Sequence, residues 1–352
     1  MRSSGYVLSG WVFGYNLGDT GCRWQVFSDL PFFSVYFVPS VVKGFFAASK
    51  KIKDLTQRTQ RAQRTTESTE AERKNASREL FLMTSPYVLA TLLFYSVSLA
   101  LYIWNLREPS RMAGIGATMV LVGALGLHYL ALLERSRLIH AVPYDDLFGS
   151  LSLFAWMLAA TYLVLEAIHR RRAVGPFVLP IVLVVFLLAH ASEARPIKAP
   201  PAQGPLFAFH VTLNILAYSA FALSFVLSVI FLLQNRRLRD HRLGMVGWRF
   251  PALDVLERMT RSSVLIGCGS LAAGMTAGFI WAHRLQGVYW DGDPKVIVTI
   301  LILAAYIGYT FLAQTAAWRG ARASVLCILN FMFVIFSYSI VNRYLSHFHR
   351  YF

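Results

Sequence analysis

Eight long apolar stretches after Thr84 constrain the fold of this chain more than any other feature of its sequence. A helix needs about 20 residues to cross the hydrocarbon core of a bilayer. Backbone groups inside lipid must find their hydrogen-bond partners within the protein, so stretches of this length are expected to be transmembrane helices. The expected spans are residues 84–105, 112–134, 146–169, 175–192, 205–234, 262–285, 294–316 and 322–345.

The composition supports an all-α polytopic membrane protein. Hydrophobic residues make up 56% of the chain and charged residues only 15%, whereas soluble domains carry about 25% charged residues. The net charge of +16 fits contact with lipid headgroups. No basic groove with interleaved aromatic residues is visible, so we expect no nucleic-acid partner. The cysteines form no CxxC or CxxCH pattern, which argues against a disulfide framework, a zinc site or a covalent haem attachment motif.

The basic residues are divided unequally between the two sets of loops. The loops after the first, third, fifth and seventh spans carry 14 Arg and Lys residues, and the opposite side carries 8. Cytoplasmic loops hold an excess of Lys and Arg, so the first set is expected in the cytoplasm. The loops 135–145 and 193–204, the 278–296 segment and both termini of the eight-span core then share the outer face.

The N-terminal extension, residues 1–83, does not fit this arrangement. Residues 28–48 are apolar and aromatic, which suggests an interfacial or ninth membrane segment, and residues 49–80 are a polar, basic linker. Eight spans with an outer C-terminus would place this basic linker outside, against the charge rule. Either 28–48 crosses the membrane, or the biological start lies near Met83, and we favour the second. Residues 84–352 are expected to form one eight-span domain.

The segment GFIWAHRLQGVYWDGDPKV at 278–296 concentrates aromatic residues, glycines and charges between two apolar spans. Pro294 suits the first turn of the following helix, and Asp293 suits its N-terminus, where a carboxylate is favoured. Trp and Tyr are common at membrane interfaces, so an aromatic belt explains the segment as well as a ligand-binding bed does.

Histidines on the expected outer face favour the ligand-binding interpretation. His210 opens the fifth span, and His347 and His349 follow the eighth. An imidazole within a membrane span, or at its mouth, is a functional candidate, although any one of them could be a satisfied structural histidine. A haem needs a flat aromatic platform and axial imidazoles, which this face can supply from different helices. The remaining histidines are weaker candidates: His128, His140, His169, His190, His241 and His283.

The 278–296 segment resembles the tryptophan-rich loop of the CcsA/ResC group of cytochrome c assembly proteins, within the haem-handling superfamily that includes CcmC and CcmF. That loop has the form WAN-x-x-W-G-x-YW-x-WDPKE. Further stretches resemble the family at 143–156 (PYDDLFGSLSLFAW), 210–220 (HVTLNILAYSA) and 337–351 (SYSIVNRYLSHFHRY). The loop residues that match are Trp281, Ala282, Gly287, Tyr289, Trp290, Asp293, Pro294 and Lys295.

The resemblance implies a protein that presents haem b on the outer, periplasmic side of the plasma (inner) membrane for attachment to apocytochrome c. It implies His210 and His349 as axial iron ligands and a CcsB/ResB-like membrane subunit as partner. The chain would be at most one subunit of a cytochrome c haem lyase, and no catalytic residue is assigned. The implied haem-binding residues are His210, His349, Trp281, His283, Gly287, Tyr289, Trp290, Asp293, Pro294 and Lys295.

Departures from the family pattern keep a second function open. Gln286 and Gly292 stand where the family has tryptophans, and no histidine occurs in 284–346. The family often has a histidine in the span after the loop. The alternative is a HemX-like membrane regulator or scaffold of haem biosynthesis that acts through the arginine-rich 236–261 loop. A transporter is less favoured, because no inverted repeat is visible and Glu166 is one of few acids in the spans.

Overall fold

The computed structural model describes residues 6–8, 11–13, 85–139, 147–191, 204–240, 251–290, 292–337 and 339. The chain divides into two units, Met1–Lys74 and Asn75–Phe352. In the first unit, strands β1 (Tyr6–Leu8) and β2 (Trp11–Phe13) pair antiparallel, with Tyr6 opposite Phe13. The expected segments 28–48 and 49–80 lie outside the described residues, so the interpretation of the extension stays a prediction.

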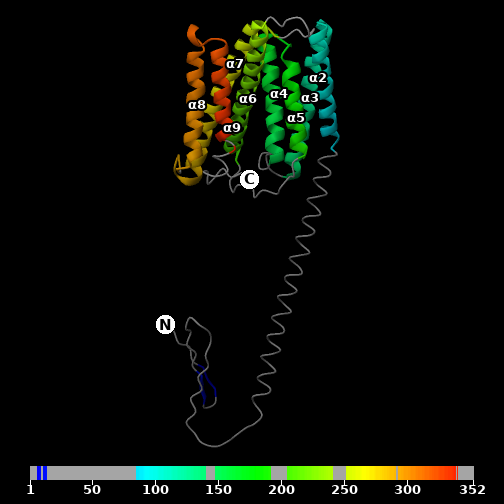
Figure 1. Cartoon of the computed structure of the whole chain (residues 1–352). Coiled ribbons are helices and arrows are strands. Elements are labelled where there is room, and N and C mark those ends of the chain that lie inside the picture. The colour runs from blue at the N-terminus through cyan, green and yellow to red at the C-terminus, as the bar shows by residue number, and fades with distance from the viewer. Residues whose placement is uncertain are drawn as a thin grey trace, which may run out of the picture. The chain divides into compact units, whose positions relative to one another are not determined.

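The second unit is a helical bundle, as the apolar stretches predict (Figure 1). Among the residues that the structure describes, six helices are long and apolar enough to cross a membrane, and α5 and α9 are shorter apolar helices. Each expected span corresponds to one helix, which confirms the all-α polytopic membrane fold. The helices are α2 (Pro86–Arg107), α3 (Arg111–Ile139), α4 (Leu147–His169), α5 (Gly175–Ala191), α6 (Pro205–Arg239), α7 (Leu253–Gln286), α8 (Pro294–Leu312) and α9 (Ala321–Phe336), with a 3-10 turn η1 (Ala316–Trp318) before α9.

Two helices extend beyond their expected spans into the arginine-rich segment. Helix α6 continues to Arg239, and α7 begins at Leu253 rather than at 262. Arginines in the last turn of α6 are favoured by the negative end of the helix dipole. At the start of α7, Arg258 pairs with Asp254 one turn earlier at 2.8 Å. Helical hydrogen bonding therefore continues past the point where the apolar pattern ends.

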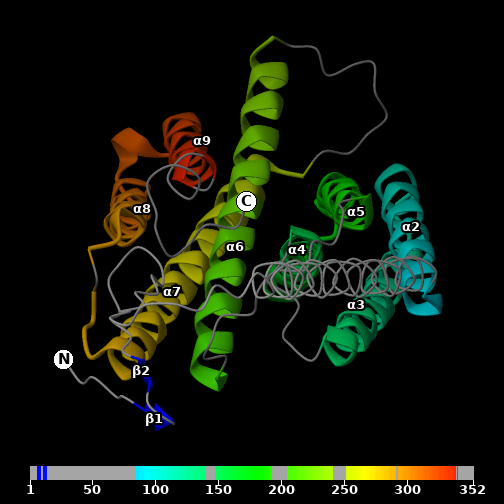
Figure 2. The ribbon, with the colours of Figure 1, turned by 90° about the horizontal axis from the view of Figure 1, so that it is seen from below.

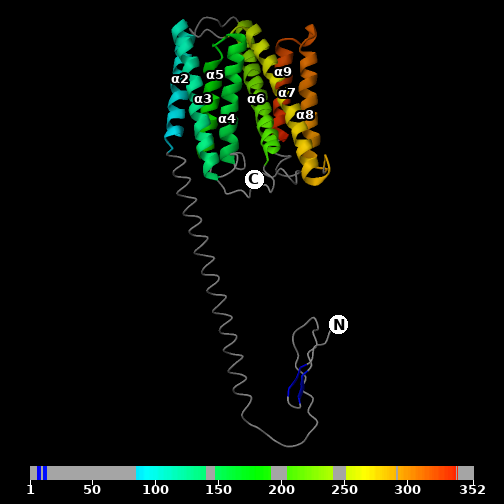
Figure 3. The same ribbon diagram turned by 180° about the vertical axis from the view of Figure 1, so that it is seen from behind.

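Successive helices of the bundle run in opposite directions. We call the end that carries the starts of α2, α4, α6 and α8 the lower end, as it is drawn in Figure 1 and, from behind, in Figure 3. The ends of α3, α5 and α7 lie there too. The helix ends that flank the segments 140–146, 192–203 and 287–293 are therefore all at one face of the bundle, as expected. That this face lies outside the cell stays a prediction.

Helix α6 lies in the middle of the bundle (Figure 2). It packs against α4 on one side and against α7 and α9 on the other. One cluster of buried apolar side chains, which includes Leu121, Leu158 and Leu227, joins α2–α5 to α6 and α7. A second, which includes Ile302 and Cys327, joins α6 and α7 to α8 and α9. The long α6 thereby supports both halves and brings the His210 turn to the lower end.

Candidate functional site

The His210 side chain lies near the start of α6 with one ring nitrogen fixed by α7. Its Nδ1 is 2.7 Å from the backbone carbonyl oxygen of Gly274. A carbonyl can only accept a hydrogen bond, so Nδ1 carries the proton and Nε2 keeps its lone pair. The Asn214 amide nitrogen lies 3.2 Å from the same Nδ1, but it donates over a shorter distance, 2.6 Å, to the His210 backbone oxygen, so the 2.7 Å contact with Gly274 sets the tautomer. A hydrogen bond at one imidazole nitrogen that frees the other is how proteins prepare a metal-ligating histidine.

Two glycines on one face of α7, which we call the glycine cradle, let this helix pack closely against the His210 turn of α6. Gly274 supplies the carbonyl, and a Cβ there would lie 3.1–3.2 Å from side-chain atoms of Asn214 and Leu213. One turn later on the same face, a Cβ at Gly278 would overlap the ring atoms of His210. Any larger residue at Gly278 would push the imidazole out of this position.

An aromatic pair lies next to His210. The Phe207 ring is 4.7 Å from the Trp281 ring and 6.4 Å from the His210 ring, centroid to centroid. Trp281 was expected at the site, whereas Phe207 was missed. Its position three residues before His210 on the same helix is the sequence signal that could have found it.

The loop after α7 turns on a glycine and exposes two aromatic rings. Gly287 caps α7 in the left-handed conformation (φ 76°), and its N–H donates to the His283 carbonyl at 2.9 Å. Tyr289 stacks on the His283 ring at 4.2 Å. Tyr289 is 61% exposed and Trp290 50% exposed. Large aromatic surfaces left open at a helix end can receive a flat ligand.

Helix α8 begins as the sequence predicts. Asp293 is its N-cap and only 4% exposed, and its carboxylate accepts from the Lys295 N–H at 2.9 Å. Pro294 occupies the first turn. The Trp290 indole N–H donates to the Asp293 carbonyl at 3.2 Å. These bonds fix the loop to α8 and hold Trp290 beside the start of that helix.

The missing tryptophan at 292 has a local explanation. Gly292 has a φ of 88°, in the left-handed region where residues with a Cβ are strained. A tryptophan at this position would require a different loop backbone. The loop of this chain therefore differs from one that carries a tryptophan there in its backbone conformation as well as in the lost side chain.

The structure brings only part of the expected site together. The rings of His210 and Trp281 both neighbour the Phe207 ring, and Lys295 lies in the first turn of α8. His349 lies outside the described residues, so the axial pair stays a prediction. The roles of the loop residues also stay predictions. The other histidines outside the described residues are His140, His241 and His347.

The single imidazole of His210 suits an iron whose remaining ligands come from another molecule. Among the described residues, no group of three His, Cys, Asp or Glu side chains could hold a bare metal ion. A single prepared imidazole beside aromatic rings suits a metal held by a flat macrocycle, which needs only axial ligands from the protein. A positive charge at Lys295 suits the carboxylates of such a macrocycle.

Comparison with known proteins decides the family. Residues 144–349 match the family described as Cytochrome C assembly protein. The chain belongs to this family. The matched segment contains His210, the whole 278–296 loop and His349, so every predicted haem-binding residue of this family member lies within it.

Individual relatives carry two different descriptions. "Cytochrome c biogenesis protein CcsA" of Porphyra purpurea is 28% identical over 286 residues, which cover 68% of this chain and 88% of the relative. "Protein HemX" of Bacillus subtilis (strain 168) is 26% identical and covers 74% of this chain and 95% of the relative. The solved structure "Cytochrome c Heme Lyase CcmF" is 19% identical with a TM-score of 0.48, over 70% of this chain and 45% of that one.

Proposed function

We propose that this protein handles haem in cytochrome c biogenesis and holds haem b at the lower end of the bundle, on the outer face of the plasma membrane. The observation that carries the proposal is the His210 geometry. Its Nδ1–H is committed to the Gly274 carbonyl, which leaves Nε2 as the ligating nitrogen. Family membership supports the role, since the match covers the whole loop.

The chain's own residues would bind and orient the cofactor. His210 and His349 would be the axial ligands, and the exposed Tyr289 and Trp290 rings would support the flat macrocycle. Lys295 would face a propionate. Haem, when bound, supplies the vinyl groups that form thioether bonds with apocytochrome thiols. The protein then contributes orientation at the outer face, beside apocytochrome c and a CcsB/ResB-like subunit.

The absorption spectrum of the purified full chain tests the proposal. We expect a Soret band with low-spin character after haemin is added, because two imidazoles would ligate the iron. His210→Ala and His349→Ala should each remove the low-spin bands. His169→Ala is the matched control, because this histidine ends α4 at the opposite end of the bundle and bonds Ser262 at 3.0 Å. Normal low-spin bands in both lower-end variants would exclude the axial pair.

A HemX-like role in the control of haem biosynthesis is the second candidate. It is favoured by the HemX relatives from Bacillus subtilis (strain 168) and Brevibacillus brevis, which match 74% and 70% of this chain. Gene deletion separates the two functions. Loss of all c-type cytochromes supports cytochrome c assembly, whereas altered porphyrin levels with normal c-type cytochromes support the HemX-like role.

A further inference from the structure

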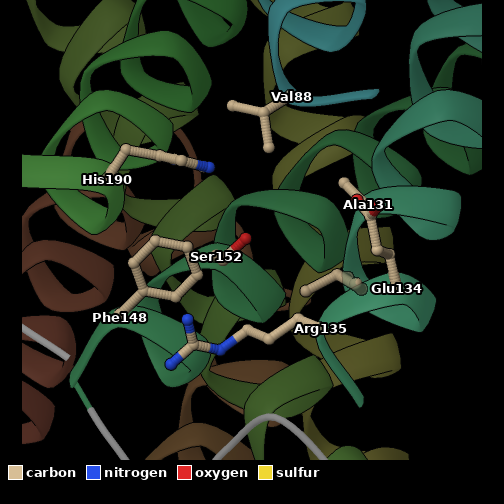
Figure 4. A pocket seen from close by; sticks show the side chains of 8 residues that line it. Val88, Ala131, Glu134, Arg135, Phe148, Ser152 and His190 are labelled. Carbon is tan, nitrogen blue, oxygen red and sulfur yellow. The ribbon is translucent and has the colours of Figure 1, made fainter. Parts of the chain in front are cut away.

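Two hollows among the described residues of α2–α5 differ greatly in size. The first lies at the lower end, between side chains that include Phe148, Ser152 and His190 (Figure 4), and has a volume of about 10 Å³. That is room for about one water molecule. The second lies at the opposite end of the bundle, which we call the upper end, and has a volume of about 410 Å³. Ligand pockets range from about 300 to 1,000 Å³, so the second hollow is large enough for a ligand and the first is not.

The larger hollow is a groove at the last turns of α2, and it lies at the height of lipid head groups. The residues that line it are Ala100, Ile103, Trp104, Arg107 and Glu108. The 22 residues of α2 extend over about 33 Å, close to the about 30 Å of a bilayer's hydrocarbon core. The last turn of α2 therefore lies where acyl chains give way to head groups.

The outer face of α2 leads from the groove into the membrane. Helix α2 lies at the edge of the bundle (Figure 2). On this helix Leu89, Leu93 and Val97 are exposed, and residues at this spacing share one helix face. Acyl chains can cover such a face, so a lipid whose head group occupies the groove would have a path for its chains.

The Glu108 carboxylate lies at a helix end that favours a cation. Glu108 is the C-cap of α2, and its N–H donates to the Trp104 carbonyl at 2.8 Å. The C-terminal end of a helix carries a partial negative charge, so a carboxylate there is unfavourable. Within the described part of the chain, the ion pairs involve other acids, namely Glu166, Asp254 and Glu257. The Glu108 charge thus suits a cation from outside the protein.

Trp104 supplies an aromatic face beside this carboxylate. It is 57% exposed, and its indole N–H donates to Glu108 Oε2 at 3.3 Å. The hydrogen bond holds the ring and the carboxylate together at the groove. A tryptophan face attracts an ammonium group, and a carboxylate accepts charge-assisted hydrogen bonds from it. The pair therefore matches a primary ammonium.

Arg107 adds the opposite charge to the same groove. Arg107 has other interactions of its own, but its guanidinium stays charged whatever else it bonds. A ligand that matches both charges carries a phosphate and an ammonium on one short head group. Phosphatidylethanolamine has this head group, together with acyl chains for the apolar face of α2.

We propose that this groove binds the head group of phosphatidylethanolamine. The ammonium lies over the Trp104 ring and donates to Glu108, and the phosphate lies on the Arg107 side. Phosphatidylcholine keeps the cation but has no N–H to donate, and phosphatidylglycerol has no cation. The groove and the His210 turn are at opposite ends of the bundle, so a failure of lipid binding leaves the haem proposal standing, and the reverse also holds.

Native mass spectrometry of the purified full chain measures this preference. The protein is released from detergent micelles that contain equal amounts of the three phospholipids, all with the same acyl chains. We expect the phosphatidylethanolamine adduct to be about fivefold more abundant than either of the others, as a cation–π contact and an exposed ion pair together imply. Equal adducts overturn the proposal, and so does an excess of phosphatidylglycerol, which would indicate a site for anionic lipids.

Two variants locate the preference. Trp104→Leu removes the aromatic face and keeps apolar bulk, whereas Glu108→Gln removes the charge and keeps the size. Each should reduce the preference to about twofold or less. Circular dichroism checks that each variant is folded. A fivefold preference that persists in both folded variants places the lipid elsewhere and overturns the proposal.

Matched controls come from the same upper end of the bundle. Trp318→Leu alters another exposed tryptophan, and Glu257→Gln alters another acid, which lies 4.0 Å from Arg319. Both controls should keep the fivefold preference. If they lose it as Trp104→Leu and Glu108→Gln do, the preference belongs to the upper end in general and not to this groove. Equal adducts of the three lipids on the unaltered protein overturn the proposal even where a variant fails to fold.

Discussion

The two halves of the bundle use buried polar groups in different ways. In α2–α5, the Glu166 carboxylate is 4% exposed and accepts from the hydroxyls of Tyr102 at 2.5 Å, Tyr162 at 2.7 Å and Thr118 at 2.5 Å. In α6–α9, the interior is mainly apolar and aromatic, with Phe221 and Tyr306 stacked at 3.7 Å. Its buried hydroxyls, such as those of Ser224 and Ser263, donate to backbone carbonyls, and its histidine with a lone pair, His210, lies at the lower end.

The difference separates structural polar groups from ligand-binding ones. Glu166 is surrounded by donors from α2, α3 and α4, and Arg172 adds a cation 3.4 Å away. A buried carboxylate satisfied in this way joins helices together and has little capacity left for a ligand. His210 has one bonded nitrogen and one with a lone pair, which is the arrangement a ligand site needs.

The largest effect is expected from breaking the Glu166 network. Glu166→Gln replaces one acceptor oxygen by an amide NH2, so the hydroxyls bonded to that oxygen lose their acceptor, and Arg172 loses its counter-charge. Each buried hydroxyl left without an acceptor costs about 1–3 kcal/mol. Thermal unfolding in detergent should show a clear loss of stability, while haemin binding to the surviving folded protein stays normal.

Glu257→Gln is the matched control for this prediction. Glu257 lies 4.0 Å from Arg319, whose side chain is 65% exposed. Exposed ion pairs contribute about 0–1 kcal/mol, so this variant should unfold nearly as the wild type does. Equal stability of the two variants would show that the α2–α5 network is not what holds that half together.

Much of the fold could be predicted from local sequence. The apolar stretches located each α-helix from α2 to α9, and Asp293-Pro294 located the start of α8. The predicted start of α7, residue 262, was too late. The apolar pattern begins only after Arg261, whereas helical hydrogen bonds already begin at Leu253. Backbone bonding does not depend on hydropathy, so helix ends outside lipid are hard to place from composition.

The candidate site was only partly predictable, because its decisive contacts join distant residues. His210 and Trp281 were identified from spacing and resemblance. The Gly274 carbonyl lies 64 residues from His210, and no local pattern indicates that contact. The same holds for Tyr102 and Glu166, also 64 residues apart. Such pairs depend on how α6 packs on α7 and α2 on α4.

A smaller effect, on binding rather than stability, is expected at the glycine cradle. Gly278→Ala places a Cβ where the His210 ring lies, so the imidazole must move. Alanine is the better helix former, so α7 itself should not weaken. We expect about tenfold weaker haemin binding, equivalent to about 1.4 kcal/mol, and reduced low-spin bands at an unchanged melting temperature.

Gly269→Ala is the control on the same helix, since a Cβ there would meet nothing within 4 Å. Its haemin affinity and spectrum should match the wild type. Should both alanines weaken binding alike, the cause would be a general change in α7. The His210 imidazole would then not be the group that binds haemin, and the contrast with the satisfied Glu166 network would fail.

The smallest effect is expected at the N-cap of α8, which connects the loop to the second half. Asp293→Ala removes the acceptor for the Lys295 N–H and should cost about 1 kcal/mol, whereas Asp293→Asn keeps an acceptor and should cost much less. Hydrogen exchange should speed up at the Lys295 amide in the alanine variant alone. If alanine instead weakens haemin binding while that amide stays protected, Asp293 acts on the ligand directly. The loop would then be a polar binding surface in its own right, and not only a support for Trp290.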